Sequence, residues 1–249
     1  MSWLNKIFSS APKTVSEGFI NPVTTELHSH LIPAVDDGVQ SMEQSVAILK
    51  RFAELGYKKV ITTPHIMADF YKNSKENLLP ALDEVKNELS KQQIDIELQV
   101  ASEYMIDDMF IDKVLSKQLL TFGNNYVLIE MPFDQEAPNM KEALFEMQLN
   151  NYQPVLAHPE RYMYYAFNKS KYEDLIQQGI LFQVNLFSLV GYYSPLQLKA
   201  AEHLIKNKMI SFVGSDIHTP RQLSVLDDSL QAALYEELCT TNKLLNNTL

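Results

Sequence analysis

From Val23 onward, short apolar runs alternate with amphipathic segments. This alternation is typical of repeated strand and helix units built around a largely parallel sheet. Seven runs are predicted as strands: Thr24 to His28, Lys59 to Thr63, Ile96 to Ser102, Tyr126 to Glu130, Gln153 to Ala157, Leu181 to Asn185 and Ile210 to Gly214.

Apolar positions at helical spacing predict helices between these strands. Ser41 and Gln44 have the spacing of a capping box, and Gly56 supplies the end of the helix that they begin. A second helix contains Pro80, which must lie in its first turn or kink it. The first helix is marked by Val46, Leu49, Phe52 and Leu55, and the second by Leu78, Leu82, Val85 and Leu89. The third is marked by Met140, Leu144 and Met147, and the fourth by Tyr172, Leu175 and Ile176. A fifth helix begins at Ser194 and Pro195, and a last one runs through Leu226, Leu230 and Leu234.

The length of 249 residues suits one large α/β barrel or two small domains. Hydrophobic residues make up 46% and charged residues 21%, the ordinary mixture of a globular protein with a substantial core. The chain has no internal repeat and no Gly/Ser-rich linker. We therefore expect one domain over residues 21–249, preceded by an N-terminal extension over residues 1–20.

The formal net charge of −10 comes from acidic residues spread along the chain, which argues against a nucleic-acid partner. The single cysteine, Cys239, excludes an internal disulfide and fits a reducing compartment. No stretch has the length of a membrane span or the apolar core of a secretory signal, so a cytoplasmic location is expected. Trp3, Leu4, Ile7 and Phe8 would share one face of a short helix, which either contacts a membrane surface or a partner, or packs on its own domain.

Histidines and carboxylates gather where the predicted strands end, which is the edge on which α/β barrels build their active sites. His28 and His30 flank Ser29, and the two-residue period of a strand points both imidazoles to the same side. Of the six histidines, only His203 lies inside a predicted helix, where it is interpreted as an ordinary helix residue. The strand-end set comprises His28, His30, Asp36, Asp37, His65, Glu103, Glu130, His158, Asp216 and His218.

Each of these motifs is weak when taken alone. An HxH pair is as often structural as functional, and Asp36–Asp37–Gly38 is typical of a turn. Their joint placement on one edge predicts a metal site, and imidazoles mixed with carboxylates suit zinc, iron or manganese better than magnesium alone. A cysteine-based phosphatase mechanism is excluded, because Cys239 lies in a predicted C-terminal helix without a following arginine.

Six segments in this order carry a resemblance to a known family: TELHSHLIPAVDDG, ITTPHI, ASEY, VLIEMP, VLAHPERY and FVGSDIHT. Together they resemble the PHP superfamily of metal-dependent phosphoesterases, and within it the bacterial tyrosine-protein phosphatases of capsule and exopolysaccharide systems. The match runs from about Thr25 to Arg221. The resemblance implies a distorted (β/α)7 TIM-like barrel that holds three divalent ions, of Mn, Fe, Zn or Mg, with manganese favoured.

The resemblance also implies roles for individual residues. Arg161 would bind the phosphate, Asp216 or His218 would be the candidate acid, and Arg221 is either a second phosphate ligand or a solvated surface arginine. Separately from the resemblance, aromatic residues of the predicted rim loops either stack on the phenol ring of a substrate or pack the loops; they are Phe70, Tyr71, Tyr162, Tyr164, Tyr165, Tyr192 and Tyr193. The implied ligand sets are His28, His30, Glu103 and Asp216 for one ion; Glu103, Glu130 and His158 for a second; and His65, His218 and Asp37, with which Asp36 competes, for a third.

The implied activity is hydrolysis of phosphotyrosine by a metal-activated hydroxide, acting on the tail of a bacterial tyrosine kinase of polysaccharide biosynthesis. One alternative is another PHP phosphoesterase, such as a histidinol-phosphate phosphatase or a nuclease, because the metal cage sets the type of reaction and not the leaving group. A second alternative is a non-catalytic regulatory module that the metals stabilise.

Overall fold

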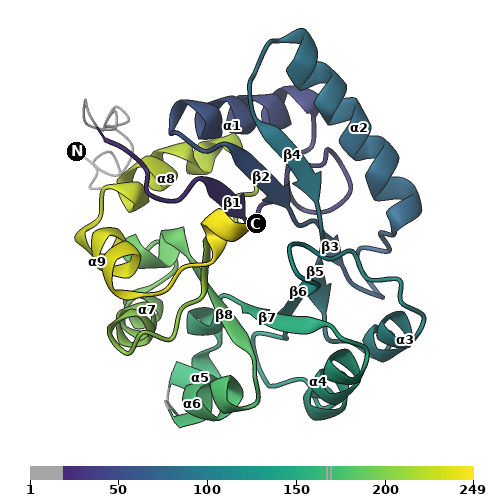
Figure 1. Cartoon of the computed structure of the whole chain (residues 1–249), viewed down its shortest axis with the longest axis vertical. Coiled ribbons are helices and arrows are strands. Elements are labelled where there is room, and N and C mark those ends of the chain that lie inside the picture. The colour runs from purple at the N-terminus through teal and green to yellow at the C-terminus, as the bar shows by residue number, and fades with distance from the viewer. Residues whose placement is uncertain (1–18, 167, 169) are drawn as a thin grey trace, which may run out of the picture.

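The computed structural model describes residues 19–166, 168 and 170–249. Within this part of the chain, parallel strands lie inside a ring of helices (Figure 1). One sheet has the order β1-β2-β4 and the other the order β3-β5-β6-β7-β8-β9, and every neighbouring pair is parallel. The strands are β1 (Thr25–Leu27), β2 (Lys59–Thr62), β3 (His65–Ile66), β4 (Glu97–Val100), β5 (Glu103–Met105), β6 (Tyr126–Glu130), β7 (Gln153–Ala157), β8 (Leu181–Asn185) and β9 (Phe212–Gly214).

Five of the predicted helices correspond to α1, α2, α4, α6 and α7. Ser41 caps the first helix, where its side chain accepts a hydrogen bond from the backbone N–H of Gln44. Pro80 lies inside α2, beyond its first turn. The helices are α1 (Met42–Glu54), α2 (Lys75–Lys91), α3 (Phe110–Leu115), α4 (Met140–Leu149), α5 (Met163–Ala166), α6 (Ser170–Gln177), α7 (Pro195–Lys206), α8 (Leu223–Leu230) and α9 (Ala233–Thr241).

Beyond the ends of β1 and β9, the first and last strands of the chain come together. The N–H of Asp216 donates to the carbonyl of His28 at 2.7 Å, and the N–H of His30 donates to the carbonyl of Ile217 at 3.0 Å. At the other end of the same two strands, the side-chain amide of Asn246 donates to the carbonyls of Thr25 and Val213 at 3.0 and 2.8 Å. Both contacts join residues far apart in the sequence and hold β1 beside β9.

Alternation along the strands divides the apolar residues between two cores. Val127 and Ile129 of β6 belong to a large core that also contains residues of the helices, whereas Leu128 belongs to a smaller core made mainly of strand residues. The smaller core comprises Leu27, Ile61, Ala101, Phe122, Leu128, Val155, Ala157 and Phe212. Because side chains alternate with period two, Glu130 points to the same side of β6 as Leu128. Strand ends therefore project polar side chains above this smaller core.

Several predicted elements differ from those observed. The second and third predicted strands correspond to β2 and β4, which end one and two residues before the predicted ends, but the short strands β3 and β5 that follow them were not predicted. Pro64, which has no N–H for the ladder, separates β2 from β3, and Ala101 and Ser102 separate β4 from β5. The predicted last helix is wrong as one element, because extended backbone at Ala232 separates α8 from α9. Helices α3 and α5 were not predicted. The count of barrel strands in the (β/α)7 description stays a prediction.

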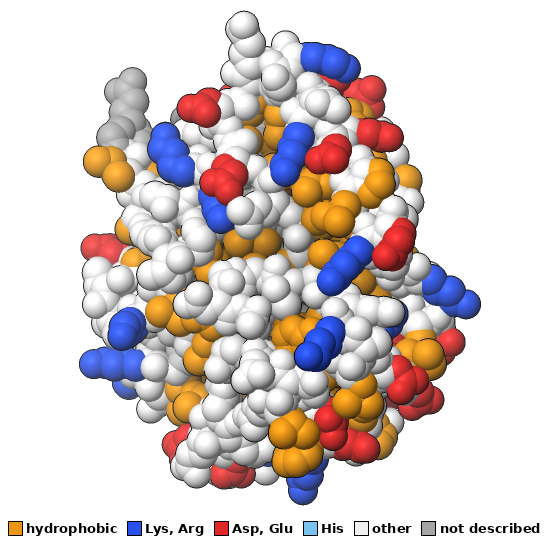
Figure 2. Space-filling view, turned by 45° about the vertical axis from the view of Figure 1, so that its right-hand side comes forward, with side chains coloured by type: hydrophobic (Ala, Val, Ile, Leu, Met, Phe, Trp, Pro, Cys, Tyr) orange, Lys and Arg blue, Asp and Glu red, His pale blue; other side chains and the backbone are white. Residues whose placement is uncertain are grey.

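Charged side chains of both signs lie on the surface of the molecule. Figure 2 shows basic and acidic side chains interspersed on one face of the molecule. In the described ranges, no helix is both long enough and apolar enough to cross a membrane. Residues Trp3 to Phe8 lie outside the described residues, so the contact proposed for them and the division into an extension over 1–20 and a domain over 21–249 stay predictions.

Candidate metal centre

The strand-end histidines and carboxylates converge into one cluster. Their ligand atoms form four overlapping groups, and within each group the atoms lie within 4.8 Å of one another. The groups are His30, Asp37, His65 and His218; His28, His30 and Glu103; His28, His158 and Asp216; and His65, Glu103 and Glu130. All nine metal ligands that the resemblance implies are thus close in space, although they come from segments throughout the chain.

His28 reaches the cluster through an irregular end of β1. Its φ of 103° ends the regular strand, so the two-residue strand period invoked for the HxH pair does not describe the backbone there. The imidazoles of His28 and His30 nevertheless lie together, with ring centroids 5.5 Å apart. Nδ1 of His28 lies 2.7 Å from Oε1 of Gln183, an oxygen that can only accept, so this nitrogen carries the proton. The other nitrogen, Nε2, faces Glu103 and Asp216. Although burial opposes it, the charges of these two carboxylates raise the pKa of His28 to about 9, so a bound cation would take the place of the Nε2 proton.

Asp36 and Asp37 occupy different positions in the cluster. Asp36 is buried, lies 2.8 Å from Nδ1 of His30 and accepts hydrogen bonds from the backbone N–H groups of Gly38 and His65. Asp37 has a side chain that is 55% exposed, and its Oδ1 lies 3.5 Å from Nε2 of His65 and 3.6 Å from Nε2 of His218. Asp36 therefore orients His30, whereas Asp37 faces two further imidazoles.

Two glutamates lie at the centre of the cluster. Oε2 of Glu103 lies 3.1 Å from Nε2 of His28 and 3.2 Å from Nδ1 of His65. Burial alone would raise the pKa of Glu103, but the neighbouring histidines His28 and His65 hold it well below its usual range. Burial, together with the charge of Glu103, raises the pKa of Glu130 to about 7. Two carboxylates this close and this buried require positive charge between them.

His158 follows β7 in a left-handed conformation, with a φ of 36°. This turn brings its Nε2 to 3.1 Å from Oε1 of Glu103. Burial lowers the pKa of His158 to about 4, so the imidazole is neutral near pH 7, which is the form that binds a cation.

Arg161 and Asp216 form the boundary of the cluster. Nη1 of Arg161 donates to Oδ2 of Asp216 at 2.8 Å, and the side-chain amide of Asn185 donates to the same oxygen at 2.7 Å. Glu160 is fully buried and accepts from the N–H of Asn185 and the hydroxyl of Ser188, which fixes the end of β8. The guanidinium is thereby held beside the metal-type residues with a defined orientation.

Among the remaining predicted site residues, Tyr71 and Tyr193 contact the cluster, at His65 and at Arg161. Arg221 is exposed and belongs to none of the candidate ligand groups, so its phosphate role stays a prediction. Tyr162 is fully buried, and its hydroxyl accepts from the N–H of Met131, which argues against the direct substrate contact predicted for it. Tyr165 is also buried, whereas Phe70 and Tyr192 are 79% and 49% exposed.

The unpaired atoms of the cluster fit divalent cations. Nε2 of His28, Nε2 of His30 and Oε2 of Glu103 are buried without a hydrogen-bond partner, and so are Nδ1 of His65 and Oε1 of Glu130. These atoms face one another at short range, since Nε2 of His28 lies 3.1 Å from Oε2 of Glu103 and Nδ1 of His65 lies 2.8 Å from Oε1 of Glu130. Crowding so many polar atoms in a buried site without full hydrogen bonding would be costly, whereas imidazoles and carboxylates together are the ligands of zinc, iron and manganese. The residues present therefore suit bound metal ions.

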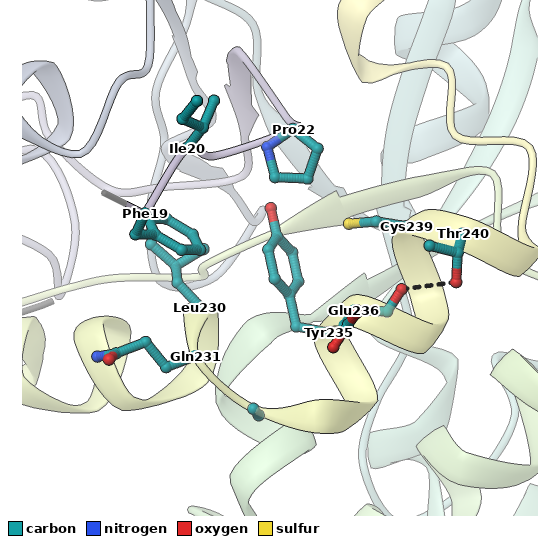
Figure 3. Close-up of a pocket in the computed structure, with 10 residues that line it drawn as sticks. Phe19, Ile20, Pro22, Leu230, Gln231, Tyr235, Glu236, Cys239 and Thr240 are labelled. Atoms are coloured by element: carbon teal, nitrogen blue, oxygen red, sulfur yellow. Dashed lines mark hydrogen bonds between the residues drawn. The ribbon is translucent and has the colours of Figure 1, made fainter. Parts of the chain in front are cut away.

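A separate hollow lies between the chain before β1 and the helices α8 and α9. Its volume is about 490 Å³, and Figure 3 shows Phe19, Pro22, Tyr235 and Cys239 around it. None of the metal-type residues lines this hollow. Burial raises the pKa of the Cys239 thiol to about 11, which agrees with the expectation that this cysteine is not a phosphatase nucleophile.

Comparison with known proteins decides the family. Residues 24–227 match the family described as "Capsular polysaccharide synthesis, CpsB/CapC". The chain belongs to the CpsB/CapC family. It is 32% identical to the tyrosine-protein phosphatase YwqE of Bacillus subtilis over 195 residues, which cover 78% of this chain and 76% of YwqE. It is 24% identical to the tyrosine-protein phosphatase CpsB of Streptococcus pneumoniae, with 78% of this chain and 82% of that protein covered.

Solved structures agree with this membership. One solved structure comes from a study of YwqE and CpsB, which that study describes as metal-dependent tyrosine phosphatases. It is 28% identical to this chain, with a TM-score of 0.75, and the match covers 88% of this chain and 96% of the solved chain. The histidinol phosphate phosphatase of Lactococcus lactis matches with a TM-score of 0.53 and 14% identity, over 86% of this chain and 93% of its own, which is a likeness of fold alone. The mixed α/β fold predicted from the sequence is confirmed at this level.

Proposed function

We propose that this chain is a metal-dependent tyrosine-protein phosphatase that hydrolyses phosphotyrosine in proteins. The observation that carries the proposal is the buried cluster of imidazoles and carboxylates beside Arg161, in which the ligand atoms of each group lie within 4.8 Å of one another. Membership of the CpsB/CapC family, whose curated members are named tyrosine-protein phosphatases, supports the same activity.

Three divalent ions would be shared among the ligand groups, with manganese favoured. His28, His30, Glu103 and Asp216 would hold one ion; Glu103, Glu130 and His158 a second; and Asp37, His65 and His218 a third. The contacts of Asp36 with three donors favour Asp37 over Asp36 as the ligand. Asp36, Gln183 and the carbonyl of Asp216 would each fix one imidazole by accepting its Nδ1 proton.

When bound at these residues, divalent ions would supply Lewis acidity and would lower the pKa of coordinated water toward neutrality. The protein contributes charge and orientation. Arg161 carries a guanidinium whose planar fork matches two phosphate oxygens, and its contact with Asp216 leaves other N–H groups free to donate. No side-chain nucleophile and no phosphoenzyme are needed.

Neither candidate acid is well suited to donate a proton. Although burial opposes it, the positive charge of His28, His30 and Arg161 holds the pKa of Asp216 well below its usual range. Burial and the charge of His30 lower the pKa of His218. The departing tyrosine oxygen, with an ordinary pKa of about 10, is a comparatively good leaving group and can take its proton from solvent.

The proposal extends to the substrate, its cellular location and the number of strands in the barrel. The substrate would be the tyrosine-phosphorylated tail of a bacterial kinase of polysaccharide biosynthesis, in the cytoplasm. The fold would be a distorted (β/α)7 barrel in which β2 with β3, and β4 with β5, each count as one interrupted strand. The N–H of Ala101 donates to the carbonyl of Thr62, and the N–H of Glu103 donates to the carbonyl of Pro64. Hydrogen bonds between the two segments thus continue across both interruptions, which supports this count.

A substrate panel tests the activity. The manganese-loaded protein is given a phosphotyrosine peptide, histidinol phosphate and an oligonucleotide, before and after treatment with EDTA. We expect the phosphotyrosine peptide to be turned over fastest, and the activity to disappear with EDTA and return with manganese. A large preference for either other substrate would favour another phosphoesterase, and no hydrolysis of any of them would favour a non-catalytic module.

A further inference from the structure

The loop after β6 carries an exposed aromatic ring at the edge of the metal centre. Phe133 lies three residues beyond Glu130, and its side chain is 49% exposed. The loop is held by two tyrosine hydroxyls: that of Tyr162 accepts from the N–H of Met131 at 3.0 Å, and that of Tyr164 donates to the carbonyl of Pro132 at 3.1 Å. The position of Phe133 is therefore set by the protein, although half of its surface meets water.

The inner side of Phe133 contacts two site residues. Its ring stacks on the imidazole of His158, with centroids 5.8 Å apart and planes inclined by 28°. The guanidinium carbon of Arg161 lies 4.6 Å from the centroid of Phe133 and 4.3 Å from that of Tyr193. Arg161 is thus enclosed by two aromatic rings, while its Nη1 contacts Asp216.

A phosphate bound between Arg161 and the metal ligands would place its ester oxygen close to these residues, and the leaving group would begin one bond further out. A tyrosyl ring at that position would meet the exposed aromatic surface of Phe133, and burying that surface would remove apolar area from water. An alkyl leaving group, such as the side chain of serine, has no ring to stack. Stacking of two aromatic rings is worth about 3- to 10-fold in an equilibrium.

We propose that Phe133 forms the wall of the leaving-group site and makes the enzyme select aromatic over alkyl phosphate esters. This inference rests on the proposed phosphatase function and adds its determinant of substrate class. Tyr71 is the competing candidate, because its ring stacks on His65 with centroids 5.6 Å apart. Phe133 is favoured because it also contacts Arg161, the residue assigned to the phosphate.

The test compares variants on matched pairs of ligands in the metal-loaded protein. Phe133→Leu removes the ring, Phe133→Tyr keeps it, and Tyr71→Leu removes the competing ring. Phe145→Leu on α4, where Phe145 is 62% exposed, makes the same change outside the site. Each protein is assayed for kcat/KM on a phosphotyrosine and a phosphoserine peptide of the same sequence. Binding of phenylphosphonate and methylphosphonate is measured by calorimetry, and thermal unfolding checks the fold.

We expect Phe133→Leu to lower the ratio of phosphotyrosine to phosphoserine turnover about 3- to 10-fold, and the ratio of phenylphosphonate to methylphosphonate affinity by a similar factor. Phe133→Tyr and Phe145→Leu should keep both ratios. An equal fall for both members of each pair would show that Phe133 only positions Arg161 and would overturn the proposal, as would a loss of selectivity in Tyr71→Leu alone. A wild-type protein that hydrolyses no phosphate ester would instead contradict the proposed function.

Discussion

Gly214 allows the closest approach between the first and last strands, and replacing it should damage both the fold and the metal centre. A Cβ atom at this position would lie 1.8 Å from the carbonyl oxygen of Leu27 and 2.7 Å from Cβ of His28. Ordinary contacts between such atoms are about 3.5 Å, so β9 would have to move away from β1 by roughly 1.5 Å in Gly214→Ala.

The cost follows from the hydrogen bonds beside this contact. The N–H of Ser215 donates to Glu26 at 2.7 Å and the N–H of Asp216 donates to the His28 carbonyl at 2.7 Å, and neither bond survives such a movement. Each buried group left unpaired costs about 1–3 kcal/mol, so the free energy of unfolding should fall by about 2–6 kcal/mol. Because His28 and Asp216 would separate, bound metal should also decrease.

Urea denaturation and elemental analysis measure these two effects. Gly56→Ala is the matched control, because the nearest atom to its added Cβ is 3.9 Å away and only the backbone, at a φ of 91°, resists the change. That control should cost about 1–2 kcal/mol and keep the metal content. If Gly214→Ala loses no more stability than Gly56→Ala and retains its metal, the account of strand closure given above is wrong.

Three further predictions concern single side chains. Arg161→Lys should lower kcat/KM for a phosphotyrosine peptide about 100-fold with unchanged metal content, since a lysine cannot replace the guanidinium fork; activity close to wild type would contradict this role. Asp36→Ala should weaken metal binding about 10- to 100-fold in a chelator competition, because His30 loses its orienting partner, and equal affinity would exclude that function. Burial raises the pKa of Cys239 to about 11, so its thiolate is scarce at pH 8 and alkylation by iodoacetamide should speed up as the pH rises toward 11. A rate that levels off near pH 9 would show an ordinary thiol.

The sequence was informative about the metal-type residues because of the geometry of parallel strands. Residues after successive parallel strands meet at one edge of a sheet, so His65, Glu130 and His158 were placed together without knowledge of any contact. The two-residue period of a strand does not by itself explain why His28 and His30 lie together, because the backbone leaves the strand at His28. The two imidazoles converge because both residues follow the same strand at the edge of the sheet, and a regular two-residue period is not required.

Supporting residues were harder to find. Gln183 and Asn185 alternate with apolar residues in β8, and this period signals that both side chains share one side of the strand. Only the structure places that side next to His28 and Asp216. Phe133 follows a proline in a loop, and nothing in its local sequence indicates that Arg161, 28 positions later, lies against its ring.

The ends of some strands and helices could not be predicted from the pattern of apolar and polar residues. Residues 96–102 alternate as one strand would, yet the strand β4 ends at Val100, and a further strand, β5, begins at Glu103 and pairs with β3 and β6. Ala232 is neither glycine nor proline, so no local signal separates α8 from α9. Tertiary packing decides such breaks.

The central claim is that side chains distant in sequence hold divalent cations beside Arg161. Crystals of the manganese-loaded protein, measured at the manganese absorption edge, test it by locating the ions directly. We predict anomalous peaks among the imidazoles and carboxylates of His28, His65, Glu103, His158 and Asp216. An ordered cluster without any anomalous peak, in crystals that contain manganese, would contradict the account.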